Sequence, residues 1–434
     1  DRFIEQMLPV VSTRHLRWIE YAYAALMMFA LTQGPVYRLW SASSDSLVIS
    51  AKTSMMHVYF ATFVVGQLPA VVIVARTCSI DVYRHRPIQL LLALHVWLGC
   101  TVLWSTLARQ SLPEFIALVL TSTAGVYLAL RFRSAEIWGI LAAAMATGLV
   151  LSLIAVSQKW DLAIDATENY WIGIYYNRNS LAPVAGVALI ASIGLLIASW
   201  EYRGVRRNVG IFGAVSLGVL SCITLWRAES RTTPFALVTA LAALILWQLL
   251  HRVPGRPMQR FGSARLSVVI VAIGVFVALR NVASLSGVPA ETSTFNSRAA
   301  LWSQNWTGFL ERPLQGWGWM AARHTAEFFK QGTWWAAFPT EWSHNGYHDL
   351  LLGGGVLAIV LFVSFLLSSF GYLSDSPRDL NGMIRFVAAC FVLVAATQES
   401  FFIGSHFLWA VIVALLVSSA RNDSDTNKAP PRVF

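Results

Sequence analysis

Charged side chains are scarce in this sequence. Lysine, arginine, aspartate and glutamate together make up 12% of the 434 residues, whereas 56% are hydrophobic. Soluble domains carry about 25% charged residues, so the composition excludes an ordinary soluble protein. Apolar runs long enough to cross a bilayer recur along the whole chain, and no stretch resembles a polar linker. We therefore predict an all-α integral membrane protein that forms a single polytopic domain over residues 1–434.

Cysteine is also scarce, and the chain has no internal repeat of the length that builds solenoids. The four cysteines lie far apart, in or beside apolar runs, and they lack the spacing of metal ligands: Cys78, Cys100, Cys222 and Cys390. Buried cysteines of this kind behave as small apolar residues. We therefore expect no disulfide framework.

The apolar runs predict about twelve transmembrane helices, because a helix needs about 20 apolar residues to cross a hydrocarbon core about 30 Å thick. Between the ninth and tenth spans lies one long segment without a span, residues 285–348. The predicted spans are 18–40, 55–76, 87–107, 112–130, 137–157, 180–200, 208–226, 233–251, 265–284, 349–373, 383–400 and 405–420.

Basic residues are distributed unevenly over the segments between these spans. If both termini are cytoplasmic, 20 of the 32 Lys and Arg residues fall in cytoplasmic segments. Of the other 12, five lie in the 280–348 stretch, where charge has little influence on orientation. Because cytoplasmic loops are enriched in Lys and Arg, we predict cytoplasmic termini and a periplasmic 285–348 segment. This topology accounts for the net charge of +10, which therefore indicates no nucleic-acid partner.

Four polar elements fall on the predicted outer face. Asn177-Arg178-Asn179 precedes the sixth span, and Ser230-Arg231-Thr232 follows the seventh. Ser297-Arg298 lies in the long segment, and His344-Asn345 lies directly before the tenth span. Charged groups beside apolar spans are costly, which makes them candidates for a functional site.

The order and position of these elements resemble the O-antigen ligase and polymerase superfamily of bacterial envelope enzymes. That family has about a dozen spans, one large outer loop, a Ser-Arg-Thr element, a Ser-Arg-x-x-x-Trp element followed by Pro-Leu-x-Gly-x-Gly, and His-Asn before a glycine-containing span. The matching residues are Ser230-Arg231-Thr232, Ser297-Arg298 with Trp302, Pro313-Leu314 with Gly316 and Gly318, and His344-Asn345 with Gly353–Gly355. The resemblance covers about residues 170–370. Asn177-Arg178-Asn179 departs from a further family element at Arg178.

The resemblance implies a membrane glycosyltransferase fold that uses lipid-linked sugars (GT-C-like) and transfer of a glycan from undecaprenyl diphosphate to an acceptor hydroxyl. Such a donor needs cations for its leaving diphosphate, and arginine offers a planar fork for phosphate oxygens. We assign Arg231 and Arg298 to the diphosphate, with Arg178 and Asn345 as further substrate-binding candidates. Histidine is suited to deprotonating a hydroxyl, so His344 is the candidate base. This chemistry requires no metal and no cofactor.

Three functions stay open at this point. An O-antigen ligase at the periplasmic face of a bacterial inner membrane, which joins the glycan to lipid A-core among the membrane lipids, is favoured because the position of the long loop suits the ligases. A polysaccharide polymerase uses the same donor. A lipid-linked or small-molecule transporter is the third, although the two halves of the chain do not resemble each other and the polar residues gather on one face.

The candidate residues also have plain structural explanations. Arginines at span ends often extend to the membrane interface, and His344 can be an ordinary loop histidine. His344, His348 and Asp349 have a spacing that could bind a metal. Glu399, near the outer end of the eleventh span, is a candidate partner for one of the arginines.

Overall fold

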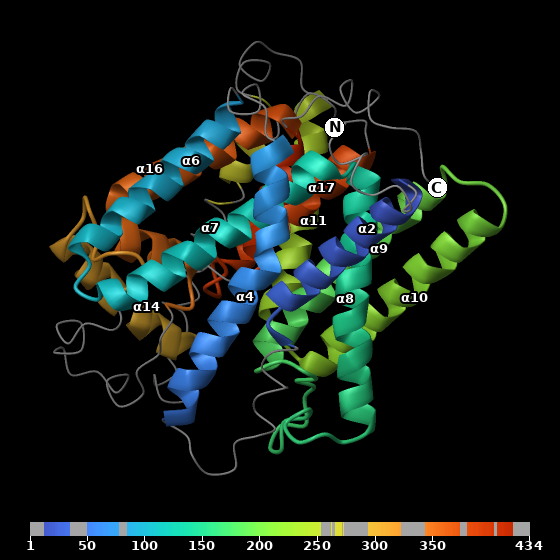
Figure 1. Ribbon diagram of the computed structural model, residues 1–434, viewed down its shortest axis with the longest axis horizontal. Helices are drawn as coiled ribbons and strands as arrows, with labels where there is room; N and C mark the ends of the chain where they lie inside the picture. The colour runs from blue at the N-terminus through green and yellow to red at the C-terminus, as the bar shows by residue number, and fades with distance from the viewer. Residues whose placement is uncertain are drawn as a thin grey trace.

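The protein is all-helical. Its structure, a computed structural model, describes residues 13–34, 50–77, 85–252, 262, 265–270, 272, 294–322, 343–373, 380–402 and 406–419. Within these residues the only β pairing is an isolated bridge between Ile164 and Trp171. The helices are α2 (Thr13–Leu31), α4 (Ser50–Thr77), α6 (Arg86–Thr101), the 3-10 helix η1 (Val102–Trp104), α7 (Ala108–Arg131), α8 (Ser134–Ser157), α9 (Arg178–Ser199), α10 (Val205–Ala228), α11 (Thr232–Arg252), α14 (Thr294–Glu311), α16 (Gly346–Leu373), α17 (Leu380–Ala395) and α18 (Phe407–Ser419) (Figure 1).

Seven helices of the described chain are long and apolar enough to cross a membrane. They are α6 extended through η1, α7, α8, α9, α10, α11 and α16. The apolar helices α17 and α18 have 16 and 13 residues, or roughly 24 and 20 Å at the α-helical rise, less than a full span. The prediction of an all-α, multi-pass membrane protein is confirmed, whereas the number twelve stays a prediction.

Two predicted segments differ in extent from the helices found. The first predicted span, 18–40, corresponds to α2, which ends at Leu31 shortly before Gln33 takes a left-handed φ of 64°. Residues 35–40, most of the predicted span 265–284, and both chain ends lie outside the described residues. The long segment 285–348 contains α14, and its residues 285–293 and 323–342 are likewise outside the described part.

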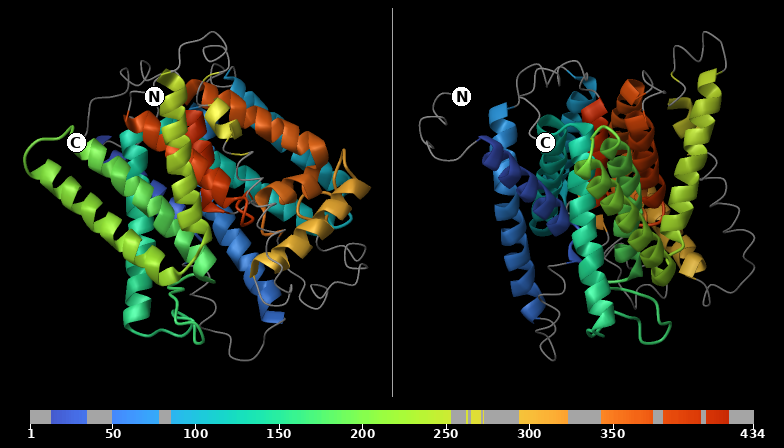
Figure 2. Two further views of the ribbon diagram at one scale, coloured as in Figure 1. Left: turned by 180° about the vertical axis from the view of Figure 1, so that it is seen from behind. Right: turned by 90° about the vertical axis from the view of Figure 1, so that its right-hand side faces the viewer.

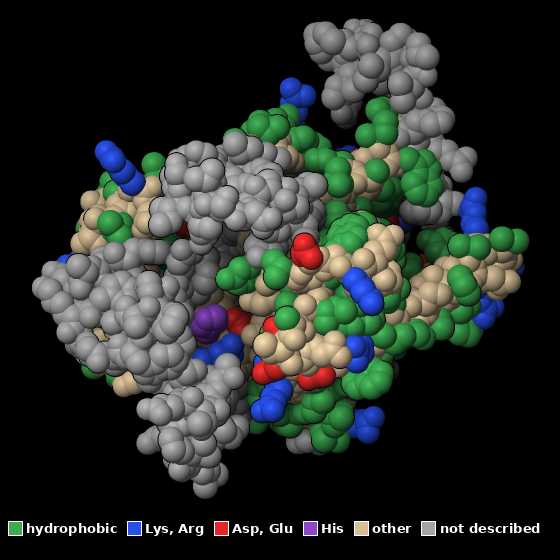
Figure 3. Space-filling view, turned by 90° about the horizontal axis from the view of Figure 1, so that it is seen from below, with side chains coloured by type: hydrophobic (Ala, Val, Ile, Leu, Met, Phe, Trp, Pro, Cys, Tyr) green, Lys and Arg blue, Asp and Glu red, His purple; other side chains and the backbone are tan. Residues whose placement is uncertain are grey.

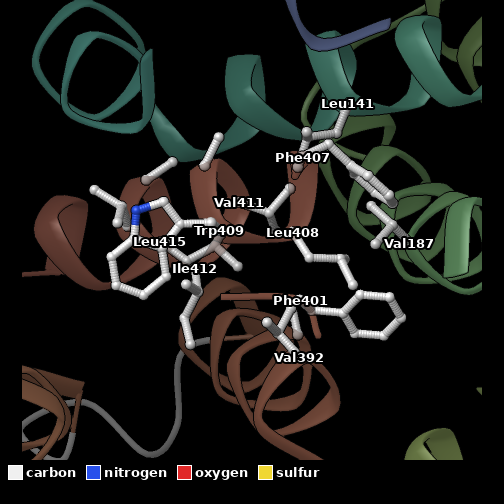
Figure 4. Close-up of a cluster of buried hydrophobic side chains, with 14 of the residues drawn as sticks. Leu141, Val187, Val392, Phe401, Phe407, Leu408, Trp409, Val411, Ile412 and Leu415 are labelled. Atoms are coloured by element: carbon white, nitrogen blue, oxygen red, sulfur yellow. The ribbon is translucent and has the colours of Figure 1, made fainter. Parts of the chain in front are cut away.

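Helix α18 forms the centre of the hydrophobic core. All residues from Phe407 to Val417 are buried, and a helix that is apolar on every side is stable only inside such a core. Figure 4 shows Trp409 and its neighbours on α18 packed among Leu141 of α8, Val187 of α9 and Val392 of α17. The surrounding helices therefore fix the position of α18 beside α17.

Helix α10 lies at the edge of the assembly (Figure 2). Large apolar side chains that recur every three or four residues along it are exposed: Val205, Val209, Phe212, Val215, Val219, Ile223 and Trp226. An exposed apolar stripe of this length on a helix that can span a membrane is suited to contact with lipid chains.

Helix α16 is broken at Gly355, whose φ is 66° and ψ is −164°. A break frees backbone N–H and C=O groups, which need partners where water is excluded. The segment after α14 supplies them: Trp317 N donates to Leu352 O at 2.7 Å, and Val356 N donates to Pro313 O at 2.8 Å. The break is thus satisfied by a chain segment inserted beside it.

Glycine is required on both sides of this contact. A Cβ on Gly316, where φ is 67°, would lie 2.7 Å from backbone atoms of Gly353 and Gly354. A Cβ on Gly355 would lie 2.3 Å from the carbonyl oxygen of Leu314. The two glycine-containing elements noted in the sequence therefore pack backbone against backbone. We call residues 313–318 and 352–356 the glycine interlock; it fixes the end of α16 that carries the site below.

Candidate active site

Five segments that are far apart in the sequence meet near one end of the molecule. They are the first turn of α9, the turn between α10 and α11, helix α14, the residues before α16, and residues 396–402 after α17. Figure 3 looks at the end that carries the loop between α8 and α9, and there a histidine, acidic and basic side chains gather in a hollow. Polar side chains from distant parts of the sequence therefore meet at this end of the molecule.

The carboxylate of Glu399 is the centre of this cluster. Its Oε1 accepts hydrogen bonds from Arg298 Nη2 at 2.6 Å and from Asn179 Nδ2 at 2.8 Å. Its Oε2 lies 2.8 Å from Nδ1 of His344. Glu399 is only 8% exposed, and a buried carboxylate is stable only when it is paired in this way. The predicted partnership of Glu399 with one of the arginines is present, and the arginine is Arg298.

The charge of Glu399 is maintained by its partners. Burial by itself would raise the pKa of this carboxyl group. The hydrogen bond from His344 and the positive charge of Arg298 act in the opposite direction and prevail, so the pKa of Glu399 lies below its usual range. Glu399 is therefore an ionised acceptor at neutral pH.

The ionised carboxylate determines the tautomer of His344. A carboxylate can only accept hydrogen bonds, so Nδ1 of His344 carries the hydrogen and Nε2 of the neutral ring has the lone pair. The backbone of His344 has a φ of 47°, and its side chain is 30% exposed. The imidazole is thus held at one nitrogen and partly exposed to solvent, an arrangement compatible with a general base.

Helix α14 delivers two of the motif residues from one face. Arg298 is buried, and in addition to its bond with Glu399 its Nη1 donates to the carbonyl of Gln398 at 2.8 Å. Trp302 lies one turn later and donates from Nε1 to the carbonyl of Ser343 at 3.2 Å. The Ser-Arg-x-x-x-Trp spacing therefore places an arginine against the Glu399 turn and a tryptophan against the residue before His344.

Asn345 connects the start of α16 to the Glu399 turn. Its Oδ1 accepts the backbone N–H groups of Tyr347 and His348 at 3.0 and 3.3 Å, which caps the helix. Its Nδ2 donates to the carbonyl of Thr397 at 3.2 Å. The Asn345 side chain therefore links the start of α16, next to His344, to the turn that carries Glu399.

The element before α9 joins the cluster through its second asparagine. Asn177 caps α9 by accepting the N–H of Ser180 at 2.9 Å. Because α9 begins after Asn177, Asn179 lies in its first turn, where its side chain contacts Glu399. Oδ1 of Asn179 also accepts a hydrogen bond from Ser230 at 3.1 Å. The sequence had drawn attention to Arg178 in this element, whereas Asn179 makes the contact.

The two other predicted arginines lie outside the buried cluster. Arg231 follows Ser230 directly, is exposed, and has no carboxylate partner within the described part of the chain. Arg178 pairs with the exposed Glu168 at 3.2 Å and lies 4.3 Å over the ring of Tyr170. The structure therefore separates one buried, ion-paired arginine from two arginines that remain accessible.

The residues with metal-ligand spacing have separate partners. Nδ1 of His348 lies 3.5 Å from Asn305 Nδ2, and its ring packs edge-on against Trp302. Oδ1 of Asp349 accepts the N–H of Ser343 at 3.3 Å. Within the described ranges, no group of three or more His, Cys, Asp or Glu residues is placed to hold a metal ion.

Arg231, Arg298 and His344 all fall within one segment that resembles a known family. Residues 216–363 match the family model described as O-Antigen ligase. This O-antigen ligase domain contains 148 of the 434 residues and is consistent with the O-antigen ligase and polymerase superfamily, whose members are glycosyltransferase-like membrane enzymes. None of the curated proteins compared with the chain matches it.

Two members of the cluster lie outside the O-antigen ligase match. Glu399 and Asn179 flank residues 216–363 on either side. The available signal for Glu399 was a carboxylate beside an apolar span, which is a candidate by itself but carries no information about its partners. Asn179 belonged to the Asn177-Arg178-Asn179 element noted in the sequence, but a neutral amide at the start of a helix gives no indication of which distant residue it contacts.

Proposed function

We propose that this protein is an O-antigen ligase: it transfers a glycan from undecaprenyl diphosphate to a hydroxyl of lipid A-core, on a GT-C-like scaffold at the periplasmic face of a bacterial inner membrane. The observation that carries the proposal is the Glu399 cluster. One buried carboxylate orients a partly exposed histidine and pairs with an arginine, and both of these residues lie in the segment that matches the O-antigen ligase model.

His344 acts as the general base in this proposal. Its Nε2 takes the proton of the acceptor hydroxyl as the hydroxyl oxygen attacks the anomeric carbon of the glycan. The bond from that carbon to the diphosphate oxygen breaks, and undecaprenyl diphosphate leaves with the electron pair. The imidazolium that forms is stabilised by Glu399 at 2.8 Å and later loses its proton to solvent.

The three arginines and Asn345 have different roles in this proposal. Arg231, exposed at the start of α11, holds the diphosphate and neutralises the charge that grows on it. Arg298 keeps Glu399 ionised and in place, and adds its own positive charge to the diphosphate site. Arg178, which follows the cap of α9, contacts the donor, and Asn345 positions His344 through its hydrogen bond to Thr397 in the turn that carries Glu399.

Interfacial chemistry fits this arrangement better than transport does. Secondary transporters bind their substrates near the middle of the membrane, between two related halves. The cluster instead draws on the ends of α9, α10 and α16, where a lipid-linked donor and an amphipathic acceptor can meet.

The deciding experiment separates the ligase from the polymerase. Purified protein is incubated with undecaprenyl-diphosphate glycan plus rough lipopolysaccharide, and in parallel with the donor alone. Glycan attached to lipopolysaccharide is the expected product. Longer lipid-linked glycans in the donor-only reaction would assign the same site to a polymerase, and transfer in neither reaction would refute the proposal.

A further inference from the structure

A cavity with several polar side chains in its lining lies between α6, Arg265 and the C-terminal half of α16. It has a volume of about 540 Å³, and its polar lining residues are Arg86, Arg265, Ser364, Ser368 and Tyr372. Arg86 begins α6, and Tyr372 lies at the end of α16 opposite to His344. Because α16 is long enough to cross a membrane, the cavity and the Glu399 cluster lie near opposite surfaces.

Arg265 is built into the wall of this cavity. Its Nε donates to the carbonyl of Leu367 at 2.7 Å, which fixes the guanidinium against α16. A Cβ on Gly371 would lie 1.8 Å from Nη2 of Arg265. The guanidinium group of Arg265 therefore lies directly against the backbone of α16 at Gly371.

The lining is suited to an anion. Two guanidinium groups and three hydroxyl groups belong to the residues that line the cavity, and none of these eight residues is acidic. Planar guanidinium forks match phosphate oxygens well. The volume lies in the range of sites that hold small ligands.

An apolar stripe leads along α16 into the cavity. Val356, Val360 and Val363 are 40%, 50% and 41% exposed, and Leu367, four residues further, lines the cavity. The spacing of three and four residues puts these side chains on one face of the helix. The cavity therefore lies directly beside an apolar surface that could contact a hydrocarbon chain. Such a surface favours an anion attached to a lipid over a free phosphate ion.

We propose that the cavity between α6 and α16 binds the phosphate headgroup of an anionic phospholipid, whose acyl chain lies along the stripe from Val356 to Leu367. Basic pockets between transmembrane helices are suited to such headgroups. The site is separate from the transferase chemistry, because its residues lie at the other end of α16. Its occupant joins two neighbouring helices at the membrane surface.

Native mass spectrometry tests the proposal. The full chain is reconstituted in vesicles of equal parts phosphatidylglycerol and phosphatidylcholine, extracted, and analysed for retained lipid. We expect selective retention of phosphatidylglycerol, and about fivefold less in Arg86→Gln and in Arg265→Gln. Arg203→Gln is the matched control, because Arg203 is an exposed arginine in another interhelical turn, between α9 and α10.

Three results would overturn the proposal. They are equal retention in the parent and both variants, the same loss in Arg203→Gln, and displacement of the lipid by excess inorganic phosphate, which would assign the cavity to a soluble anion. Arg86 is exposed at the first position of its helix, so Arg86→Gln stays informative even if Arg265→Gln fails to fold. Arg265→Lys, which keeps the charge, should retain more lipid than Arg265→Gln.

Discussion

Nδ1 of His344 lies 2.8 Å from Oε2 of Glu399, although the two residues are 55 positions apart in the sequence. This contact gives the histidine a defined tautomer and a defined orientation, the two properties that an imidazole needs to act as a base. It also makes the proposed catalytic residue depend on a carboxylate outside the segment that matches the O-antigen ligase model. The contact can be tested by substituting either residue.

Glu399→Gln should lower the rate of glycan transfer by about 10²-fold or more. The amide keeps the size of the side chain but presents an NH₂ group or a weaker acceptor to His344, so Nε2 loses its fixed role as the acceptor. Initial rates with purified enzyme and saturating donor measure the effect. Glu311→Gln, at an exposed acid on α14, should keep the parental rate; an unchanged rate in Glu399→Gln would remove Glu399 from the mechanism.

His344→Gln and His344→Asn should bind donor normally and transfer it about 10²–10⁴ times more slowly. Asparagine tolerates the left-handed backbone of this position, so loss of activity in both variants separates chemistry from folding. Donor binding is measured in parallel by equilibrium titration. His348→Ala is the neighbouring control and should react near the parental rate. A His344→Gln enzyme that turns over like the parent would refute the role of base.

The parental rate should fall as the pH is lowered. A protonated imidazole cannot accept the hydroxyl proton, so activity is present while His344 is neutral and is lost as His344 becomes charged. Because the pKa of Glu399 lies below its usual range, this carboxylate stays ionised as the pH is lowered below neutral. The pH–rate profile measures this limb, and Glu399→Gln should shift it; an identical profile in that variant would argue against the pairing.

Arg231→Ala should reduce transfer at least about tenfold, since a charge-assisted hydrogen bond contributes about 1.5–3 kcal/mol. Arg231→Lys should restore part of the activity, because lysine keeps the charge without the fork. The matched control is Arg227→Ala one turn away, where the guanidinium lies over the ring of Trp171 at 5.5 Å and is expected to be dispensable. Equal activities for the two alanine variants, at equal protein levels, would contradict the assignment.

Gly316→Ala and Gly355→Ala should each destabilise the folded protein by about 1–3 kcal/mol or more, because each forces a left-handed backbone on alanine and a contact with main-chain atoms. Thermal unfolding of the purified protein in detergent measures the effect. Gly213→Ala in α10 is the control, since a Cβ there meets nothing within 4 Å, and its stability should hold or rise. Unchanged unfolding in both interlock variants would show that the break in α16 tolerates side chains.

The membrane class and the rough positions of the helices could be derived from the sequence alone. Apolar runs of spanning length are a local property, and the uniformly apolar residues of α18 already indicate a core helix. The order of the motifs in the sequence identifies the candidate arginines and His344. It does not indicate which of the arginines is buried. Arg231 and Arg298 both follow a serine in similar motifs, so the sequence does not distinguish them. Only the packing of α14 against residues 396–402 makes Arg298 buried and ion-paired.

Tertiary structure decided the composition of the site. Glu399 gathers Arg298 from 101 residues away and Asn179 from 220 residues away, and no local pattern records which distant groups will satisfy a buried carboxylate. The same holds for Gly316 and Gly355, whose motifs appear separate until the break in α16 requires backbone partners. The amino-acid sequence determined that this chain must bury apolar helices in a membrane and keep a few polar groups at their ends. The way the helices pack decided which of those groups touch, because a buried charge or an open hydrogen bond is stable only beside its complement.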